Sequence, residues 1–144
     1  MTLQELNDNY YYVSDIDQWG VDDLWELMEP QNGRYLGDCE SYILSLIAKV
    51  DGMKDLEPWY LELTSDNKII GHCVGKDKNT GLFIDCNYRT FVSEKVIFDG
   101  WTNTRPFTKY EIWKGVTYSK VFKFVYNKGS FGKKLAVSVA NFLK

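Results

Sequence analysis

Several features that would restrict the class of this protein are missing from its sequence. No apolar run in its 144 residues approaches the ~18 residues that a membrane-spanning helix requires. The N-terminus, MTLQELNDNYYYVSD, has neither the basic segment nor the apolar core of a secretory signal. With 17 Lys and Arg against 20 Asp and Glu, the net charge is −3, which gives no footprint for nucleic acid. We therefore expect a cytoplasmic protein with neither a nucleic-acid nor a membrane partner.

Cysteine and histidine are also scarce. Three cysteines, Cys39, Cys73 and Cys86, cannot all pair within one chain, which fits a reducing compartment. Neither CxxC nor HxxxH spacing occurs, so the common zinc-binding patterns are missing. His72 is the single histidine, and any imidazole chemistry depends on it.

Apolar and aromatic side chains are abundant. With 44% hydrophobic and 26% charged residues, the sequence fits one globular domain over residues 1–144 with a single core. Ten tyrosines and five tryptophans are more than a minimal core needs. They are typical either of a groove that grips a peptide or of a tyrosine-rich sheet.

Two stretches have helical spacing. VDDLWELMEP places apolar residues at i, i+3, i+4 and i+7, which predicts a short amphipathic helix over 21–28. A longer apolar stripe predicts a core helix over 39–50, with Asp38 as its N-cap and Gly52 as its C-terminal stop.

Downstream, the pattern changes to that of strands. Over residues 58–92, β-branched and aromatic residues are interrupted by TSDN and KDKNT, which predicts consecutive antiparallel strands. We expect further strands over 94–98, 109–114 and 116–126, while FGKKLAVSVANFLK fits either a helix or a strand. This order predicts an α+β domain whose N-terminal helices pack on an antiparallel sheet.

The KDKNT turn predicts which side chains meet on the sheet. If its loop holds four residues, His72 and Asp85 are direct cross-strand neighbours, with β-carbons about 5 Å apart. Cys73 and Cys86 then point to the opposite face, because side chains alternate along a strand. A zinc site that combined them with His72 and Cys39 would not converge. We interpret Cys73 and Cys86 as small buried apolar residues.

Cys39 begins the predicted core helix. Unpaired N–H groups and the macrodipole at a helix N-terminus stabilise a thiolate, and a protonated His72 would stabilise it further. A carboxylate such as Asp85 can orient the imidazole as general base and acid. Equally, Cys39 lies on the apolar stripe, and a His–Asp pair on a hairpin can be a satisfied polar pair. The residues alone leave both interpretations open.

The motifs GDCES, GHCV and LFID, in this order, resemble the transglutaminase-like cysteine peptidases, in particular a small bacterial branch. The similarity covers residues 33–88. It implies a papain-like arrangement of a helix packed on an antiparallel sheet. It also implies Cys39 as nucleophile, His72 as general base and acid, and Asp85 as the orienting residue, with no required cofactor.

The branch that cleaves surface adhesins has acidic residues beside its cysteine that are associated with calcium. The resemblance therefore implies a calcium ion as an optional ligand of Asp38 and Glu40. Alternatively, Asp38 is only an N-cap and Glu40 a first-turn acid that suits the macrodipole. Ser41 stands where the family often has a further acid.

Acyl chemistry also needs an oxyanion hole. The backbone N–H of Cys39 is one natural donor, because it lies at a helix N-terminus. The second donor should come from upstream, where Gln31 is favoured over Asn32 and Trp19.

These observations predict a thiol hydrolase that cleaves a peptide or isopeptide bond of a protein or peptide substrate through a Cys39 thioester. The alternatives are a transglutaminase, an amidase of the NlpC/P60 kind, and a non-catalytic binding or structural protein that keeps the fold. A compact chain of this kind also resembles accessory proteins of tailed bacteriophages, which would place it in the host cytoplasm or the virion.

Overall fold

The computed structural model describes residues 1–143, which form an α+β fold of six helices and seven strands. The α+β class predicted from the sequence is confirmed. No helix within residues 1–143 combines the length and apolarity needed to cross a membrane. In chain order the elements are α1 (Leu3–Asn9), β1 (Tyr10–Tyr12), α2 (Asp15–Trp19), β2 (Pro30–Gln31), β3 (Arg34–Gly37), α3 (Cys39–Lys49), β4 (Glu57–Ser65), β5 (Lys68–Lys76), β6 (Phe83–Ile84), α4 (Glu94–Ile97), β7 (Asn103–Pro106), α5 (Lys109–Tyr126) and α6 (Ser130–Phe142).

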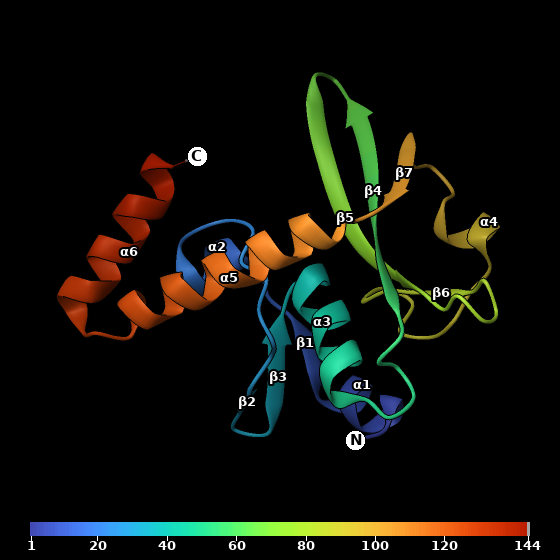
Figure 1. Cartoon of the computed structure of the whole chain (residues 1–144), viewed down its shortest axis with the longest axis horizontal. Helices are drawn as coiled ribbons and strands as arrows, with labels where there is room; N and C mark the ends of the chain where they lie inside the picture. The colour runs from blue at the N-terminus through green and yellow to red at the C-terminus, as the bar shows by residue number, and fades with distance from the viewer. Residues whose placement is uncertain (144) are drawn as a thin grey trace.

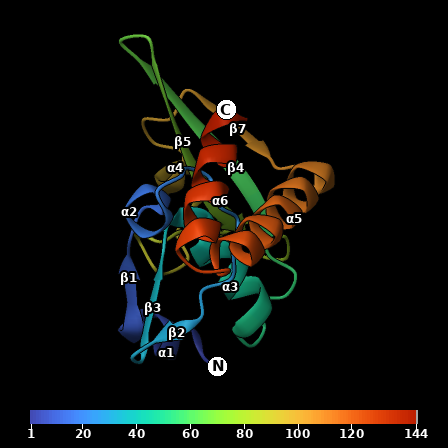
Figure 2. The same cartoon turned by 90° about the vertical axis from the view of Figure 1, so that its left-hand side faces the viewer.

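The strands form two sheets (Figure 1). The smaller sheet has the order β1-β3-β2, in which β1 runs parallel to β3 and β2 antiparallel to it. The larger sheet has the order β6-β5-β4-β7 and is antiparallel throughout. The helix α3 follows β3 directly and packs against β5, so it connects the two sheets. Figures 1 and 2 show α5 and α6 as a helical hairpin on one side of the molecule.

The predicted core helix is confirmed as α3. The Asp38 side chain caps it by accepting a hydrogen bond from the backbone N–H of Ser41 (3.1 Å). Its apolar stripe, including Tyr42, Ile43 and Leu46, is fully buried in the main core together with residues of α1 and β5. A helix of this length is marginal by itself, so this packing supplies most of its stability.

The predicted helix over 21–28 is wrong, although its apolar residues are buried as their spacing predicted. Asp23 has φ of 57°, in the left-handed region, which interrupts a right-handed helix. The backbone N–H of Leu24 donates to the Asp15 carboxylate instead of to a helical carbonyl. The apolar residues of this segment are therefore buried at helical intervals although the segment is irregular.

The strands predicted over 94–98, 109–114 and 116–126 are also wrong. The first segment is α4, and the other two form the single helix α5. Thr108 and Glu111 form a capping box that starts α5, and this pattern is readable in the sequence. β-Branched and aromatic residues follow, but packing against α6 and residues 21–24 outweighs their strand propensity.

Two further elements complete the comparison with the sequence. The C-terminal segment, which fitted either a helix or a strand, is the helix α6. The short strand β7 was not predicted; it pairs with β4 and closes one edge of the larger sheet.

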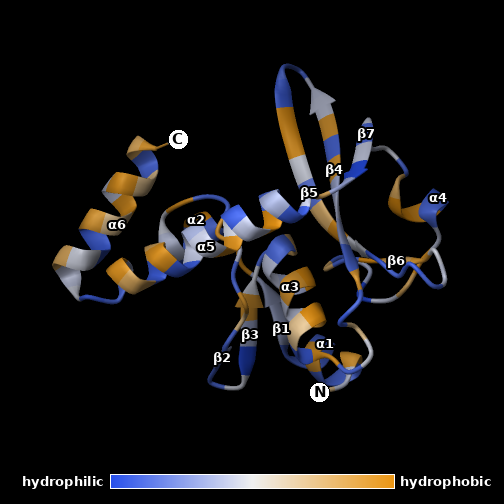
Figure 3. Cartoon of the chain, viewed as in Figure 1, coloured by the Kyte–Doolittle hydropathy of each residue, from blue (hydrophilic) through white to orange (hydrophobic). Residues whose placement is uncertain are grey.

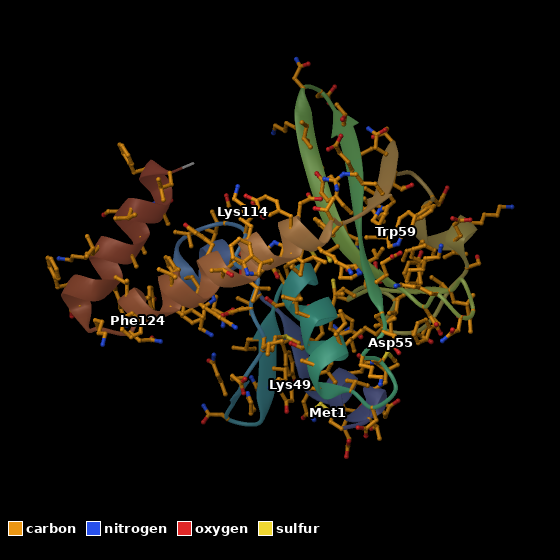
Figure 4. All side chains as sticks on the ribbon, viewed as in Figure 1. Met1, Lys49, Asp55, Trp59, Lys114 and Phe124 are labelled. Atoms are coloured by element: carbon orange, nitrogen blue, oxygen red, sulfur yellow. The ribbon has the colours of Figure 1, made fainter. Side chains whose placement is uncertain are left out.

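The buried apolar residues form three clusters. One lies around α3 and contains all three cysteines. A second joins α5 and α6 to residues 21–24. The third covers the other face of the larger sheet, where Leu61, Val74 and Phe83 pack beneath Ile97 of α4. Trp59 packs on this third cluster, in the part of the molecule between β4 and α4 (Figure 4).

Candidate active site

Cys39 is the first residue of α3, and its thiol is buried. Its Sγ donates a hydrogen bond to Oε2 of Glu40, at 3.1 Å. On the other side, the backbone N–H of Cys73 in β5 is near enough to the sulfur to lower the pKa of the thiol. Since Cys73 follows His72 directly, this contact brings the Cys39 sulfur against the strand that carries the histidine.

The surroundings of Cys39 favour the neutral thiol. Burial raises the pKa of the Cys39 thiol far above its ordinary value, and the Glu40 and Asp38 carboxylates add to the rise. The N–H of Cys73 acts in the opposite direction, but it is outweighed. A stable thiolate, expected from the helix N-terminus alone, is therefore not the resting form. Any attack by Cys39 requires a base that removes the thiol proton as the bond forms.

His72 and Asp85 are joined by a hydrogen bond between Nε2 and Oδ2, at 2.8 Å. The predicted register is wrong by two residues, because Gly75 pairs with Ile84 instead of Leu82. The turn is longer than four residues, since the N–H of Asp77 bonds back to the carbonyl of Leu82. A slip of two residues keeps every side chain on its face. The pair therefore still meets, diagonally instead of directly.

The Asp85 carboxylate is held in place by its own turn. Its Oδ1 accepts hydrogen bonds from the backbone N–H groups of Asn87 (3.1 Å) and Tyr88 (2.7 Å). This leaves Oδ2 directed at His72. The carboxylate side chain is 4% exposed and the imidazole 11%, so water has little access to the bond between them.

Trp101 covers the imidazole, a contact that the sequence analysis did not predict. Its ring stacks on that of His72 with centroids 5.6 Å apart and planes 10° from parallel. Trp101 lies just before β7 in a segment without apolar periodicity, so no pattern predicted its position. With one face against Trp101 and Nε2 bonded to Asp85, the ring presents Nδ1 as its second nitrogen.

The cysteine and the His–Asp pair do not share a direct bond. Within residues 1–143 no hydrogen bond joins Cys39 to His72, and the thiol proton is directed at Glu40. Cys73 and Cys86 are buried in the α3 cluster, as predicted, and they are free thiols. The structure therefore brings together His72 and Asp85, and it sets Cys39 beside the neighbouring residue of β5.

Asp38 and Glu40 share their surroundings with a third carboxylate that the sequence did not predict. Asp15 of α2 is 4% exposed, and its Oδ1 has no hydrogen-bond partner. Burial and the nearby Asp38 raise the pKa of Asp15 to about 9, and the same two causes raise that of Glu40 to about 8. Asp15 lies 23 residues before Asp38, and the parallel pairing of β1 with β3, in which Tyr12 lies opposite Gly37, brings them together.

Oxygen-rich carboxylates are the ligands that calcium prefers, and the unpartnered oxygen of Asp15 is an available donor. Among residues 1–143, however, no three Asp, Glu, His or Cys side chains have the spacing of a metal site. Burial and mutual repulsion raise the pKa values of Asp15 and Glu40, so a proton or a cation would neutralise them. The calcium ion that the resemblance implies stays a prediction, and the chemistry proposed below uses none.

Gln31 is not placed as an oxyanion donor. It pairs with Arg34 at the exposed tip of the β2–β3 hairpin, whereas Cys39 follows the other end of β3. At ~3.3 Å per residue, the extended chain separates the two by more than about 10 Å. The alternatives are no better placed: Asn32 lies in the same turn, and the Trp19 indole N–H donates to Glu26.

Tyr12 is a better candidate for the second donor. It pairs with Gly37, two residues before Cys39, in the register of β1 on β3. Tyr12 is 59% exposed, and partial burial together with the nearby Asp38 carboxylate raises its pKa to about 12. The hydroxyl therefore stays protonated and lies close to the start of α3. Three consecutive tyrosines were visible in the sequence, but their position was not.

An open groove of about 770 Å³ begins at Glu40. It runs between the irregular segment and α5, and aromatic rings form much of its wall. Of the candidate site, Glu40 lines this groove, whereas Cys39, His72 and Asp85 do not. The principal lining residues are Trp25, Tyr60, Phe107, Trp113 and Tyr118.

Comparison with known proteins does not assign this protein to a family. No protein-family model matches the sequence, and no curated protein is significantly similar to it. The resemblance to the transglutaminase-like cysteine peptidases therefore stays a prediction that rests on the motifs within residues 33–88.

Proposed function

We propose that this protein is a thiol hydrolase with a papain-like arrangement, which cleaves a peptide or isopeptide bond through a Cys39 thioester. The hydrogen bond between His72 Nε2 and Asp85 Oδ2 carries this proposal. It is buried, shielded by Trp101, and held by a carboxylate that its own turn orients. A carboxylate that fixes one ring nitrogen leaves the other for proton transfer.

The reaction begins with the neutral thiol. Nδ1 of His72 removes the Cys39 proton as the sulfur attacks the carbonyl carbon of the substrate, which forms a C–S bond and a tetrahedral oxyanion. The backbone N–H of Cys39 and the Tyr12 hydroxyl would stabilise the oxyanion. The C–N bond then breaks, and the imidazolium gives its proton to the leaving amine.

Water clears the thioester by the same route. His72 takes a proton from water as the water oxygen attacks the thioester carbon, and the C–S bond then breaks. The thiolate recovers the proton, and a carboxylic acid leaves. For the first step, the Cys39 proton has to turn from Glu40 toward His72. A substrate in the groove that begins at Glu40 would displace this contact.

Two alternatives follow from the same geometry. If an amine clears the thioester instead of water, the protein is a transglutaminase or another acyl transferase. The second alternative is a non-catalytic binding protein that keeps the fold. The buried Cys39 thiol, bonded to Glu40 and strongly disfavoured as a thiolate, is the observation in its favour.

Cleavage of a mixed peptide library, read by mass spectrometry, tests the proposal. We expect new termini with the wild-type protein and none with Cys39→Ser, while Cys73→Ser retains activity. Products joined to an added primary amine would identify acyl transfer. Equal product patterns from the wild type and Cys39→Ser would contradict any thiol mechanism.

A further inference from the structure

The α5–α6 hairpin has an inner face that packs and an outer face that residues 1–143 leave exposed. On the inner side, Phe122 of α5 and Ala136 and Ala140 of α6 pack with Val21 and Leu24. Figures 1 and 2 show the hairpin on one side of the molecule, with α6 furthest from the larger sheet. The outer face of both helices is therefore open to solvent.

Large apolar side chains line the outer face of α5. Tyr110, Trp113, Val121 and Phe124 are all exposed, Trp113 at 62% and Phe124 at 66%. With Thr117 between them, they follow one another at intervals of three or four residues, so they form one stripe along the helix. Figure 4 places Phe124 near the end of α5, far from Trp59 and the larger sheet.

The helix α6 carries a second exposed apolar stripe. Phe131, Leu135, Val139 and Phe142 recur at intervals of four, four and three residues. Phe131 is 78% exposed and Phe142 86%. Figure 3 shows the apolar residues as orange bands along α6 and the far half of α5. Exposed apolar residues of this size, gathered on one pair of helices, mark an interaction surface.

The charge of the hairpin is mostly of one sign: its one acidic residue, Glu111, lies in the first turn of α5 and pairs with Arg105. Residues 112–144 contain seven lysines and no Asp or Glu. Residues 1–66, in contrast, contain fifteen acidic residues and three basic ones. Lys114 and Lys120 lie three residues before and after Thr117, so they flank the stripe of α5 on either side. Lys128 also lies close to the surface, with its Nζ 4.2 Å from the Phe124 ring centroid.

We propose that the outer face of the α5–α6 hairpin docks on an anionic phospholipid bilayer. Exposed Phe and Trp enter the boundary between headgroups and acyl chains, while the flanking lysines contact lipid phosphates. Neither helix crosses the bilayer. This proposal is independent of the chemistry at Cys39.

Charge favours a lipid surface over a second copy of the chain. Two hairpins packed face to face would bring their lysines together, and the one acidic residue of each hairpin, Glu111, is already paired with Arg105. A surface of phosphates complements lysines at any position, and it repels the acidic residues 1–66, which orients the molecule. The sequence analysis did not predict this face, because it expected residues 109–114 and 116–126 to form strands.

Co-sedimentation with vesicles tests the proposal. Vesicles of phosphatidylcholine with phosphatidylglycerol should bind the protein at least tenfold more strongly than vesicles of phosphatidylcholine alone. Binding should weaken as salt is raised from about 0.05 M to about 0.5 M, because salt screens exposed charges.

Variants at exposed positions separate the contribution of the apolar side chains to vesicle binding from that of the lysines. Phe131→Ser with Phe142→Ser, and separately Lys114→Glu with Lys120→Glu, should each lower binding at least tenfold. Ile69→Ser and Lys68→Glu change exposed residues at the tip of the larger sheet and should bind as the wild type does. Unchanged thermal unfolding would show that each variant folds.

Three results would overturn the proposal. These are no binding to anionic vesicles, equal binding to both kinds of vesicle, and wild-type binding by the hairpin variants. If sedimentation velocity instead shows self-association that Phe131→Ser with Phe142→Ser abolishes, without vesicle binding, the face is an interface between copies and the proposal is wrong.

Discussion

The imidazole Nε2 of His72 lies 2.8 Å from Oδ2 of Asp85, beneath the indole of Trp101. This relationship fixes which ring nitrogen is occupied. We therefore expect catalysis to depend on the negative charge of Asp85, and an uncharged side chain of the same shape should not replace it.

We expect Asp85→Asn to lower the rate of peptide-library cleavage by about 10²–10⁴-fold, because the amide would hold the imidazole in the wrong tautomer. The asparagine oxygen can still accept the N–H groups of Asn87 and Tyr88, so the fold should survive. The exposed Asp99→Asn serves as control and should leave the rate unchanged. A cleavage rate unaffected by Asp85→Asn would show that the pair is structural.

Glu40 should restrain the reactivity of Cys39. Its carboxylate raises the pKa of the thiol and accepts a hydrogen bond from it. Burial raises the pKa of Glu40 to about 8, so this negative charge is present above that pH. There, Glu40→Gln keeps an acceptor and removes the charge, so the pKa of Cys39 should fall. Alkylation at a fixed pH above about 8 should accelerate on the order of tenfold per pKa unit.

The matched control for Glu40→Gln is Glu29→Gln, whose carboxylate is exposed and paired with Lys49. It should leave the alkylation rate of Cys39 unchanged. Slower alkylation in Glu40→Gln than in the wild type would mean that Glu40 assists the thiol instead of restraining it.

Asp15 should make the protein less stable as pH rises. Its pKa is about 9 in the folded state and about 3.9 in an unfolded chain. Between these two pH values Asp15 is protonated in the folded state and ionised in the unfolded chain. The stability that this proton contributes to the fold is therefore complete below about pH 4 and is lost as pH rises toward 9. Asp15→Asn should remove this dependence while still accepting the N–H of Leu24.

Thermal unfolding across pH checks the role of Asp15. At pH 8 we expect Tm of Asp15→Asn to exceed that of the wild type by about 2–4 °C for each kcal/mol recovered, and the two to converge near pH 4. The exposed Asp8→Asn should follow the wild type. Parallel curves for the wild type and Asp15→Asn would show that Asp15 is ionised throughout.

Calcium should have little effect on the carboxylates near Cys39. If protons neutralise Asp15 and Glu40, excess calcium or a chelator should leave Tm unchanged at neutral pH. A rise in Tm with calcium, lost in Asp38→Asn, would instead support the calcium ion that the resemblance implies.

The sequence predicted the elements in which several local signals coincide. The helix α3 has apolar spacing, an Asp38 cap and a turn at its end, and its prediction is confirmed. The pairing of His72 with Asp85 survived a wrong register, because a slip of two residues keeps both on one face.

Other features depend on contacts that no local pattern encodes. The helix α5 carries β-branched and aromatic residues, and only its Thr108–Glu111 capping box signalled a helix. Asp15 approaches Asp38 because β1 pairs in parallel with β3, and Trp101 reaches His72 from a segment without periodicity. Each of these positions follows from tertiary packing, which overrides propensity.

The pH dependence of Cys39 alkylation, measured in the wild type and in His72→Ala, tests the thiol hydrolase proposal most directly. Iodoacetamide labelling with peptide mapping follows all three cysteines at once. We predict that Cys39 reacts faster than Cys73 and Cys86, and that His72→Ala slows Cys39 alone, because the base that removes its proton is gone. If Cys39 reacts no faster than the other two cysteines, and His72→Ala changes nothing, the thiol has no catalytic partner and the proposal is contradicted.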